Sequence, residues 1–326
     1  MTCKYTWKSK LGPCIQDFIA FKRSNGFLYD AEEYQLHRFD DFCYNHKELN
    51  VTTITRSQME LWRIQFRNEN TNTRNYRIDY IRVFSRYLNS LGVDSYIPSK
   101  GASTYKPKVY VPSVKELQIF FRYIDNNAVS NSSILHTRLN LNYPVLFRLF
   151  YCCGLRLSEV CYLKRNLVNF DDKTITILQS KGKKDRKIYL SNDLSNVFKK
   201  FDSKMDSLIP DRKWMFCGYE PTKSYSKTSI DGLFHKFWIS AFPDWQGKVP
   251  TPQALRHCFV INKVEQWMAE GKNVNAMMPY LSKTLGHNSA DETYYYYKNL
   301  KSIFPLIQKN DTHSSKIIPE VKNYEN

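Results

Sequence analysis

Apolar residues in the first hundred positions recur three and four residues apart, which predicts a module of four helices. The first helix begins near Leu11, and Gly26 ends it. The second opens at Asp30, which forms the pattern of a capping box with Glu33, and runs to about Leu49. Aromatic and aliphatic stripes at this spacing are typical of a hydrophobic core.

Two further helices complete the module. Met59, Trp62 and Phe66 mark the third helix. The fourth follows the apolar stripe over residues 76–91, and Gly92 closes it as a C-terminal cap. Residues 1–100 are therefore predicted to form one helical domain.

A linker and a second domain follow. Residues 101–112 hold Pro, Gly, Ser and Lys without a helical period. Ser113 and Glu116 form another capping-box pattern, so a second domain is predicted over residues 113–310. Residues 311–326 are polar and lack a clear period, which indicates a mobile tail or a segment that docks on a partner.

The second domain is mostly helical, with one exception. The β-branched run at 173–179, the cationic stretch after it and a short strand at about 186–190 predict a β-hairpin. Residues 214–216 can add a strand. The chain is therefore predicted to be mainly α, with a small β-hairpin or sheet in a mixed α/β second domain.

The charge is strongly positive and unevenly placed. The net charge is +17, and residues 101–310 carry 31 Lys and Arg against 17 Asp and Glu. Such an excess favours a polyanionic partner, above all nucleic acid, although a basic ribosomal protein would share it. In the first domain, Arg74, Arg77, Arg82 and Arg86 are expected on the exposed face of the fourth helix, either as phosphate contacts or as solvated charges.

Cysteine usage and hydropathy bear on the compartment. None of the eight cysteines forms a CxxC pair, and several lie in apolar helical runs. This pattern favours free buried thiols in a reducing cytosol and argues against a zinc site. No apolar run approaches the roughly 20 residues of a membrane span, and the first ten residues lack a signal-peptide pattern. We expect a cytoplasmic, nucleoid-associated protein without a membrane partner.

Several residues have the chemistry needed for phosphoryl transfer without a metal, which requires a nucleophile, cations and a proton donor. Arg156, at a helix junction in GLRLSE, can grip a phosphate, and Glu159 can orient it. Lys181, in the hairpin turn, can enter a DNA minor groove and present an ammonium to a leaving oxygen. Its neighbours Lys183, Lys184 and Arg186 are expected to contact the DNA backbone. Each segment alone also fits an ordinary surface charge.

A further segment with candidate catalytic residues follows GLRLSE and the hairpin, nearer the C-terminus. Thr251 and Pro252 begin a helix that places Arg256 in its second turn. His257 is about 100° away around that helix, so both cannot easily face one phosphate. Next come His287, in LGH, and four successive tyrosines at 294–297. Of these tyrosines, at most one or two can face a given phosphate.

In this order and spacing, the motifs resemble those of tyrosine recombinases of the phage-integrase family over nearly the whole chain. Residues 11–100 resemble the helical core-binding domain of that family, and 113–300 its catalytic domain. The resemblance assigns catalytic roles to Arg156, Lys181, Arg256 and His287, with Glu159 in support. The family nucleophile usually lies nine residues after the histidine and three after a threonine. Both counts give Tyr296, with Tyr297 as the alternative.

One position departs from the family pattern. The family usually has histidine, sometimes lysine, three residues before the second arginine, and this chain has Gln253. Glutamine can donate a hydrogen bond to a phosphate oxygen but cannot carry a proton at neutral pH. If the family histidine takes the tyrosine proton, activity falls or another group, such as His257, replaces it.

The resemblance implies a site-specific recombinase that clamps duplex DNA, forms a 3′-phosphotyrosine and assembles as a tetramer on DNA. It implies no metal and no nucleotide cofactor, and the sequence shows neither a Walker loop nor a clear carboxylate-plus-histidine cluster. Two alternatives are a type IB topoisomerase-like relaxing activity and a DNA-binding protein with a degenerate active site.

Overall fold

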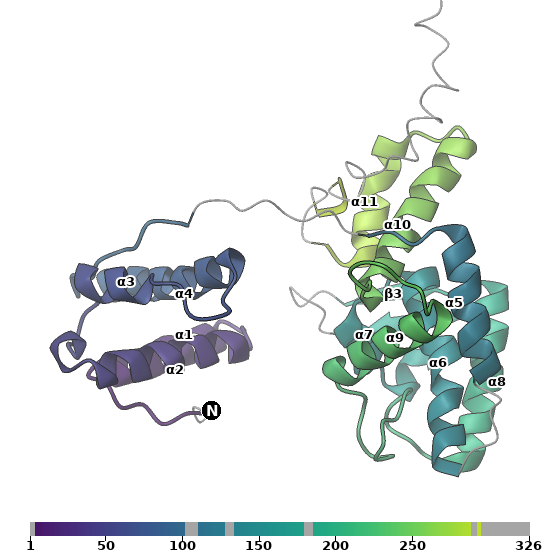
Figure 1. Cartoon of the computed structure of the whole chain (residues 1–326), viewed down its shortest axis with the longest axis horizontal. Helices are drawn as coiled ribbons and strands as arrows, with labels where there is room; N and C mark the ends of the chain where they lie inside the picture. The colour runs from purple at the N-terminus through teal and green to yellow at the C-terminus, as the bar shows by residue number, and fades with distance from the viewer. Residues whose placement is uncertain (1–3, 102–109, 128–133, 179–184, 288–291, 295–326) are drawn as a thin grey trace, which may run out of the picture. The chain divides into compact units, whose positions relative to one another are not determined.

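The computed structural model describes residues 4–101, 110–127, 134–178, 185–287 and 292–294. The chain forms two compact units, Met1–Pro107 and Lys108–Asn326. Helices make up most of both units, and the second also holds a small sheet, so the predicted fold class is confirmed (Figure 1).

The described part of the first unit consists of four α-helices and one short 3₁₀ helix. They are α1 (Gly12–Ser24), α2 (Asp30–Asn45), η1 (Lys47–Leu49), α3 (Arg56–Trp62) and α4 (Thr71–Ser90). Phe18, Phe39, Trp62 and Phe84 are fully buried between them and form the centre of the core. Gly92 follows α4 with φ +82°, a left-handed conformation that favours glycine, as the cap prediction required.

The capping box predicted at the start of α2 is wrong. Tyr29 precedes the helix in a left-handed conformation, with φ 59°, and its side chain caps nothing. The Glu33 carboxylate is buried and accepts hydrogen bonds from the Lys4 amide at 2.8 Å and the Arg23 guanidinium at 2.6 Å. Partners elsewhere in the fold therefore use the oxygens that a capping box would need.

The exposed position predicted for Arg77 on α4 is also wrong. This arginine is only 1% exposed. Its guanidinium lies over the rings of Trp62 and Phe66, at 4.5 Å and 3.9 Å, and pairs with Glu69 at 2.8 Å. These contacts hold the Arg77 side chain in the core, so it is not available to contact DNA. Arg74 and Arg82 are half-buried and remain candidates.

The second unit begins with the capping box predicted at Ser113 and Glu116, which is confirmed. The Ser113 amide donates to Glu116 Oε2 at 2.7 Å, and the Glu116 amide donates to Ser113 Oγ at 3.3 Å. The helices that follow are α5 (Val114–Asn127), α6 (Ile134–Cys153), α7 (Leu157–Cys161), η2 (Arg165–Leu167), α8 (Asn192–Leu208), α9 (Lys227–Ala241), α10 (Pro252–Ala269) and α11 (Val274–Leu285).

The sheet is antiparallel, in the order β1 (Val168–Asn169), β2 (Thr174–Ile177) and β3 (Arg186–Tyr189). Strands β2 and β3 form the predicted hairpin, with Ile175 opposite Ile188. The strand suggested at 214–216 is not formed, since Trp214 makes only an isolated bridge to Lys164. The third strand is β1, whose two residues are too few to show a period.

The core of the second unit positions the ends of several helices. Helix α10 packs against α6, and Leu255 and Cys258 of α10 lie in the same buried core as Phe147 and Phe150 of α6. Seven cysteines lie in the described part of the chain, and all are free thiols. Among the described helices, none combines the length and apolar character that a membrane span requires.

Candidate active site

A cavity of about 370 Å³ lies where the ends of several helices in the second unit converge. The lining side chains come from the start of α7, the start of α9, the first turns of α10, and the segments after α11. They are Arg156, Leu157, Ser158, Lys227, Gln253, Arg256, His287 and Glu292. The structure thus brings together Arg156, Gln253, Arg256 and His287, which the sequence places up to 131 positions apart.

A glycine turn sets the position of Arg156. Gly154 follows α6 with φ +61°, and a Cβ there would lie 2.4 Å from the ring of Phe259. This sharp turn places Arg156 at the N-cap position of α7. Its guanidinium donates to Glu159 at 3.1 Å and to the Gly286 carbonyl, and the side chain stays 19% exposed.

Glu159 is a buried carboxylate shared by two arginines. It binds Arg156 as the spacing predicted, and it also pairs with both terminal nitrogens of Arg186, at 2.9 Å and 2.8 Å. Burial raises the pKa of Glu159, but the hydrogen bonds and charges of the two arginines outweigh burial and hold the pKa below its ordinary value. Glu159 is therefore ionised at neutral pH and fixes Arg156.

The DNA-backbone contact predicted for Arg186 is not supported. Arg186 is only 9% exposed, and all three guanidinium nitrogens donate within the protein. Two donate to Glu159, and Nε donates to the Thr284 carbonyl at 2.7 Å. Arg186 therefore ties β3 to α7 and α11, and its charge is neutralised beneath the cavity.

Arg256 is the most deeply buried cation of the cavity, at 1% exposed. Pro252 occupies the first turn of α10 as predicted, although Thr251 makes no side-chain cap. The Arg256 guanidinium donates to the carbonyls of Gly154 and of Leu285, the latter at 3.0 Å. These bonds join the ends of α6 and α11 and hold the guanidinium at the cavity.

The glycine of the LGH motif leaves room for the two other arginines. Gly286 caps α11 with φ +66°, a left-handed conformation. A Cβ at this position would lie 2.8 Å from Arg186 Nη1 and 3.0 Å from Arg156 Nη1. Any other residue here would displace the arginines, so the motif follows from packing as well as from backbone geometry.

His287 is neutral and fixed at both ring nitrogens. Nε2 accepts from Arg256 at 2.9 Å, so Nδ1 carries the proton and donates to Thr293 Oγ1 at 2.7 Å. Burial lowers the pKa of His287 to about 3, with help from the charges of Arg256, Arg156 and Arg186. These contacts give His287 the role of positioning Arg256, and its hydrogen bond to a phosphate stays a prediction.

Gln253 and His257 differ in their access to the cavity. Gln253 is exposed and lines it, so the position that departs from the pattern faces the same space as Arg256. His257 is buried, and burial followed by the charge of Arg256 lowers its pKa to about 4. It does not line the cavity among the described residues, which argues against His257 as a substitute proton acceptor.

Comparison with known proteins decides the family. The model of the phage integrase family matches residues 126–302, more than half of the chain. The chain belongs to this family, the tyrosine recombinases. A tyrosine recombinase of Agathobacter rectalis is 22% identical over 295 residues, which cover 76% of this chain and 92% of that protein.

Two solved structures have a similar fold. The Tn1549 transposon integrase, in complex with transposon right-end DNA, matches with a TM-score of 0.63 at 14% identity, covering 91% of this chain and 99% of that one. The XerH recombinase, bound to its difH substrate after cleavage, matches with a TM-score of 0.61 at 17% identity, covering 86% and 78%. At such identities the comparison concerns the fold alone.

Several predicted site residues of the recombinase lie outside the described residues. They are Lys181, Lys183, Lys184, Tyr296 and the alternative Tyr297. One residue next to the tyrosine cluster, Thr293, and one member of the cluster, Tyr294, are described. Thr293, which set the register for Tyr296, is buried and bonds His287 and Ser282, while Tyr294 donates to Asn275 at 3.2 Å. At least one of the four tyrosines therefore has a packing role.

Sequence reasoning missed Lys227, the first residue of α9, which lines the cavity. Its only local signal is Ser226, whose hydroxyl caps the helix by accepting from the Ser229 amide at 3.0 Å. A serine cap predicts where a helix starts, but not which cavity the helix faces.

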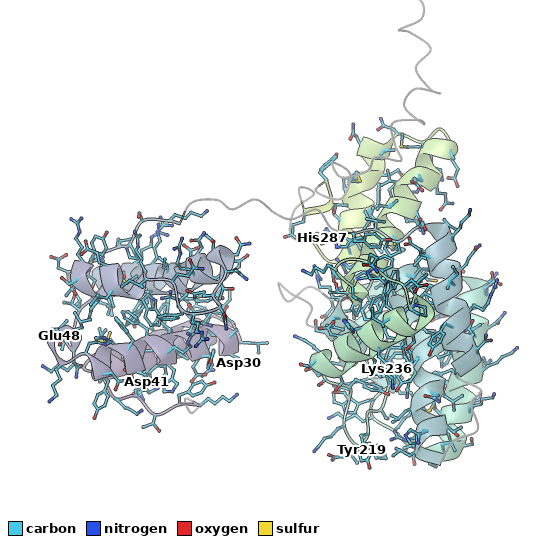
Figure 2. The ribbon with its side chains drawn as sticks, viewed as in Figure 1. Asp30, Asp41, Glu48, Tyr219, Lys236 and His287 are labelled. Atoms are coloured by element: carbon cyan, nitrogen blue, oxygen red, sulfur yellow. The ribbon has the colours of Figure 1, made fainter. Side chains whose placement is uncertain are left out.

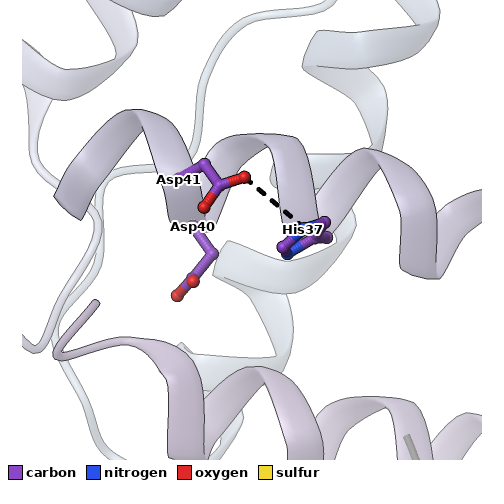
Figure 3. A group of neighbouring side chains, drawn as sticks. All are labelled: His37, Asp40 and Asp41. Carbon is purple, nitrogen blue, oxygen red and sulfur yellow. Dashed lines mark ion pairs between the residues drawn. The ribbon is translucent and has the colours of Figure 1, made fainter. Parts of the chain in front are cut away.

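One group of potential metal ligands lies in the first unit. His37 lies one helical turn before the adjacent Asp40 and Asp41 on α2, and their ligand atoms lie within 4.8 Å of one another (Figure 3). Asp40 accepts hydrogen bonds from the amides of Lys8 and Ser9, at 2.7 Å and 3.1 Å, and Asp41 pairs with the Lys8 ammonium at 3.0 Å. These contacts give the two aspartates a structural role, since they hold the segment before α1 against α2.

Replacement of Gln253 tests its place in the site. Gln253→Ala should lower the rate of DNA cleavage roughly five- to hundredfold. Leaving a phosphate oxygen without its hydrogen bond should raise the activation free energy by about 1–3 kcal/mol. DNA affinity should change little. Gln253→His should match or exceed the parent. Single-turnover cleavage of a duplex that traps the covalent intermediate measures both.

Gln266→Ala is the matched control, since Gln266 is exposed on the same helix and outside the cavity. If Gln253→Ala cleaves like this control, Gln253 plays no part in the chemistry. If only Gln253→His cleaves, the natural chain is a DNA-binding protein with a lapsed active site.

Proposed function

We propose that this chain is a site-specific DNA recombinase that cleaves and rejoins duplex DNA through a 3′-phosphotyrosine, in integration, excision or transposition of DNA. The observation that carries the proposal is the cavity lined jointly by Arg156, Gln253, Arg256 and His287. Two guanidinium groups fixed by backbone carbonyls are suited to the charge that develops on a phosphate in the transition state.

The proposed reaction conserves bond energy. The Tyr296 hydroxyl oxygen attacks the scissile phosphorus and gives up its proton to solvent water, and the bond from phosphorus to the 5′ oxygen breaks. Lys181 gives its proton to that leaving oxygen, so a free 5′-hydroxyl and a 3′-phosphotyrosine form. The 5′-hydroxyl of a partner strand then attacks the adduct and releases the tyrosine. Since the adduct keeps the bond energy, the cycle needs no nucleotide cofactor.

The arginines act on the nonbridging oxygens. Arg156 is oriented by Glu159 and the Gly286 carbonyl, and Arg256 by Gly154, Leu285 and His287. Side chains held in this way need little reorganisation when charge develops, which is how fixed donors accelerate phosphoryl transfer.

We propose further roles for the two units. Residues 1–100 act as a core-binding domain that contacts DNA phosphates, with Arg74 and Arg82 as candidates, and 113–310 act as the catalytic domain. Four copies assemble on two duplexes, because exchange requires four strands to be cut. This assembly is expected on the nucleoid, in the cytoplasm. The complexes of XerH and of the Tn1549 integrase with DNA support a duplex DNA partner.

The role of Lys181 as general acid can be tested with a modified substrate. Lys181→Ala should be crippled on normal DNA and should recover on a duplex with sulfur at the 5′-bridging position, because a thiolate leaves without a proton. Lys187→Ala, at an exposed position of β3, is the control and should cleave both substrates. Equal loss on both substrates would remove Lys181 from this role.

Strand exchange tests the function itself. Trapped adducts on random duplex libraries give the preferred sequence, which is then placed on two plasmids. The parent protein, without added nucleotide or metal, should produce recombinant plasmid. Relaxation of supercoils without exchange would favour the topoisomerase-like alternative. Binding without cleavage would indicate a degenerate active site.

A further inference from the structure

Among the described residues that line the cavity, one cationic side chain, that of Lys227, has no role in the proposed reaction. Lys227 is the first residue of α9 and lines the cavity together with Arg156, Gln253 and Arg256. Its side chain is exposed. Within the described part of the chain no ion pair engages its ammonium, whereas the Arg156 guanidinium is paired with Glu159. Lys227 can therefore give its full charge to a ligand.

The backbone around Lys227 favours an anion at the same place. Lys227 opens α9, a helix of 15 residues, and Gln253 lies in the first turn of α10, a helix of 18 residues. The first amides of a helix and its dipole attract negative charge. Two long helices thus begin at this cavity. Its only described carboxylate is that of Glu292, against three cations from Arg156, Lys227 and Arg256.

We propose that Lys227 contacts the scissile phosphate and supplies, from α9, the positive charge that Gln253 lacks on α10. This inference rests on the function proposed above. It explains how a neutral residue at position 253 is compatible with an active enzyme, since the Lys227 ammonium takes the place of the histidine or lysine that the family usually has there. Lys227 is then a substrate-binding residue, distinct from the leaving-group acid Lys181.

The first test removes the ammonium. Lys227→Gln should lower single-turnover cleavage roughly ten- to hundredfold, the effect of losing one charge-assisted hydrogen bond to the reacting group. Lys236→Gln is the matched control, because Lys236 is exposed on the same helix, and Figure 2 shows it apart from His287. Equal cleavage by the two variants would overturn the proposal.

The second test asks whether the two positions exchange roles. Adding Gln253→Lys to Lys227→Gln should restore cleavage to within roughly threefold of the parent, a coupling expected only for residues that share one partner. If the double variant cleaves no better than Lys227→Gln, the proposal fails. It also fails if 5′-bridging sulfur rescues Lys227→Gln, since Lys227 would then be the acid.

Salt dependence separates this proposal from the function on which it rests. A parent that forms no adduct would contradict the proposed function. The binding of Lys227→Gln to duplex DNA would still test the phosphate contact. Losing one contact should reduce the slope of log affinity against log salt concentration by about one. An unchanged slope would overturn the role of Lys227.

Discussion

A Tyr296→Phe variant is expected to bind duplex DNA like the parent and to form no covalent adduct. Two spacings in the resemblance select this tyrosine, nine residues after His287 and three after Thr293. Both reference residues are fixed in the structure, since His287 bonds Arg256 and Thr293. Loss of the nucleophilic oxygen removes the first chemical step, so cleavage should fall below detection on a denaturing gel.

Tyr297→Phe is the control for this variant, because it alters the neighbouring ring and leaves the assigned nucleophile. It should form the adduct. If Tyr297→Phe forms none while Tyr296→Phe does, the register is wrong by one residue and the spacing rules do not hold in this chain.

Arg186→Ala should lower the free energy of unfolding by about 3–5 kcal/mol. The variant leaves the Glu159 carboxylate buried with only Arg156 as its partner, and breaking a buried pair costs about this much. Urea denaturation measures the loss. Cleavage should fall as well, since Glu159 would no longer hold Arg156 in one position.

Lys187→Ala is the matched control on β3, where an exposed side chain should contribute about 0.5 kcal/mol or less. The salt dependence of DNA binding distinguishes the two views of Arg186. A structural arginine leaves the slope unchanged. A stable Arg186→Ala protein with a slope reduced by about one would restore the DNA contact and contradict the burial seen here.

Local sequence signals predicted the helices and strands well, but they predicted poorly which charged side chains are buried. The cap at Gly92 and the capping box at Ser113 depend on near neighbours, and the structure confirms them. Helical spacing gave the four helices of the first unit but not all their ends, since α2 ends at Asn45 and α3 at Trp62, before Phe66. Arg77 and Arg186 were expected on the surface because charged side chains usually are. Their carboxylate partners lie 8 and 27 positions away, so only the folded chain reveals the pairs.

The candidate site was predictable where its residues belong to local sequence motifs, and was not predictable elsewhere. Arg156 and His287 follow tight turns at Gly154 and Gly286, where packing helps to explain the glycines, and Arg256 lies in the second turn of α10. Lys227 belongs to no such motif and reaches the cavity because α9 starts there. The strand β1 was missed because two residues carry no period.

Mapping the covalent adduct tests the account most directly. The parent protein is incubated with a nicked duplex that traps the intermediate, digested with protease, and analysed by mass spectrometry. We expect one modified peptide, carrying a 3′-nucleotide phosphate on Tyr296. An adduct on another residue would contradict the assigned nucleophile. No adduct with any sequence of a random duplex library, despite tight binding, would contradict the central claim that this cavity cleaves DNA.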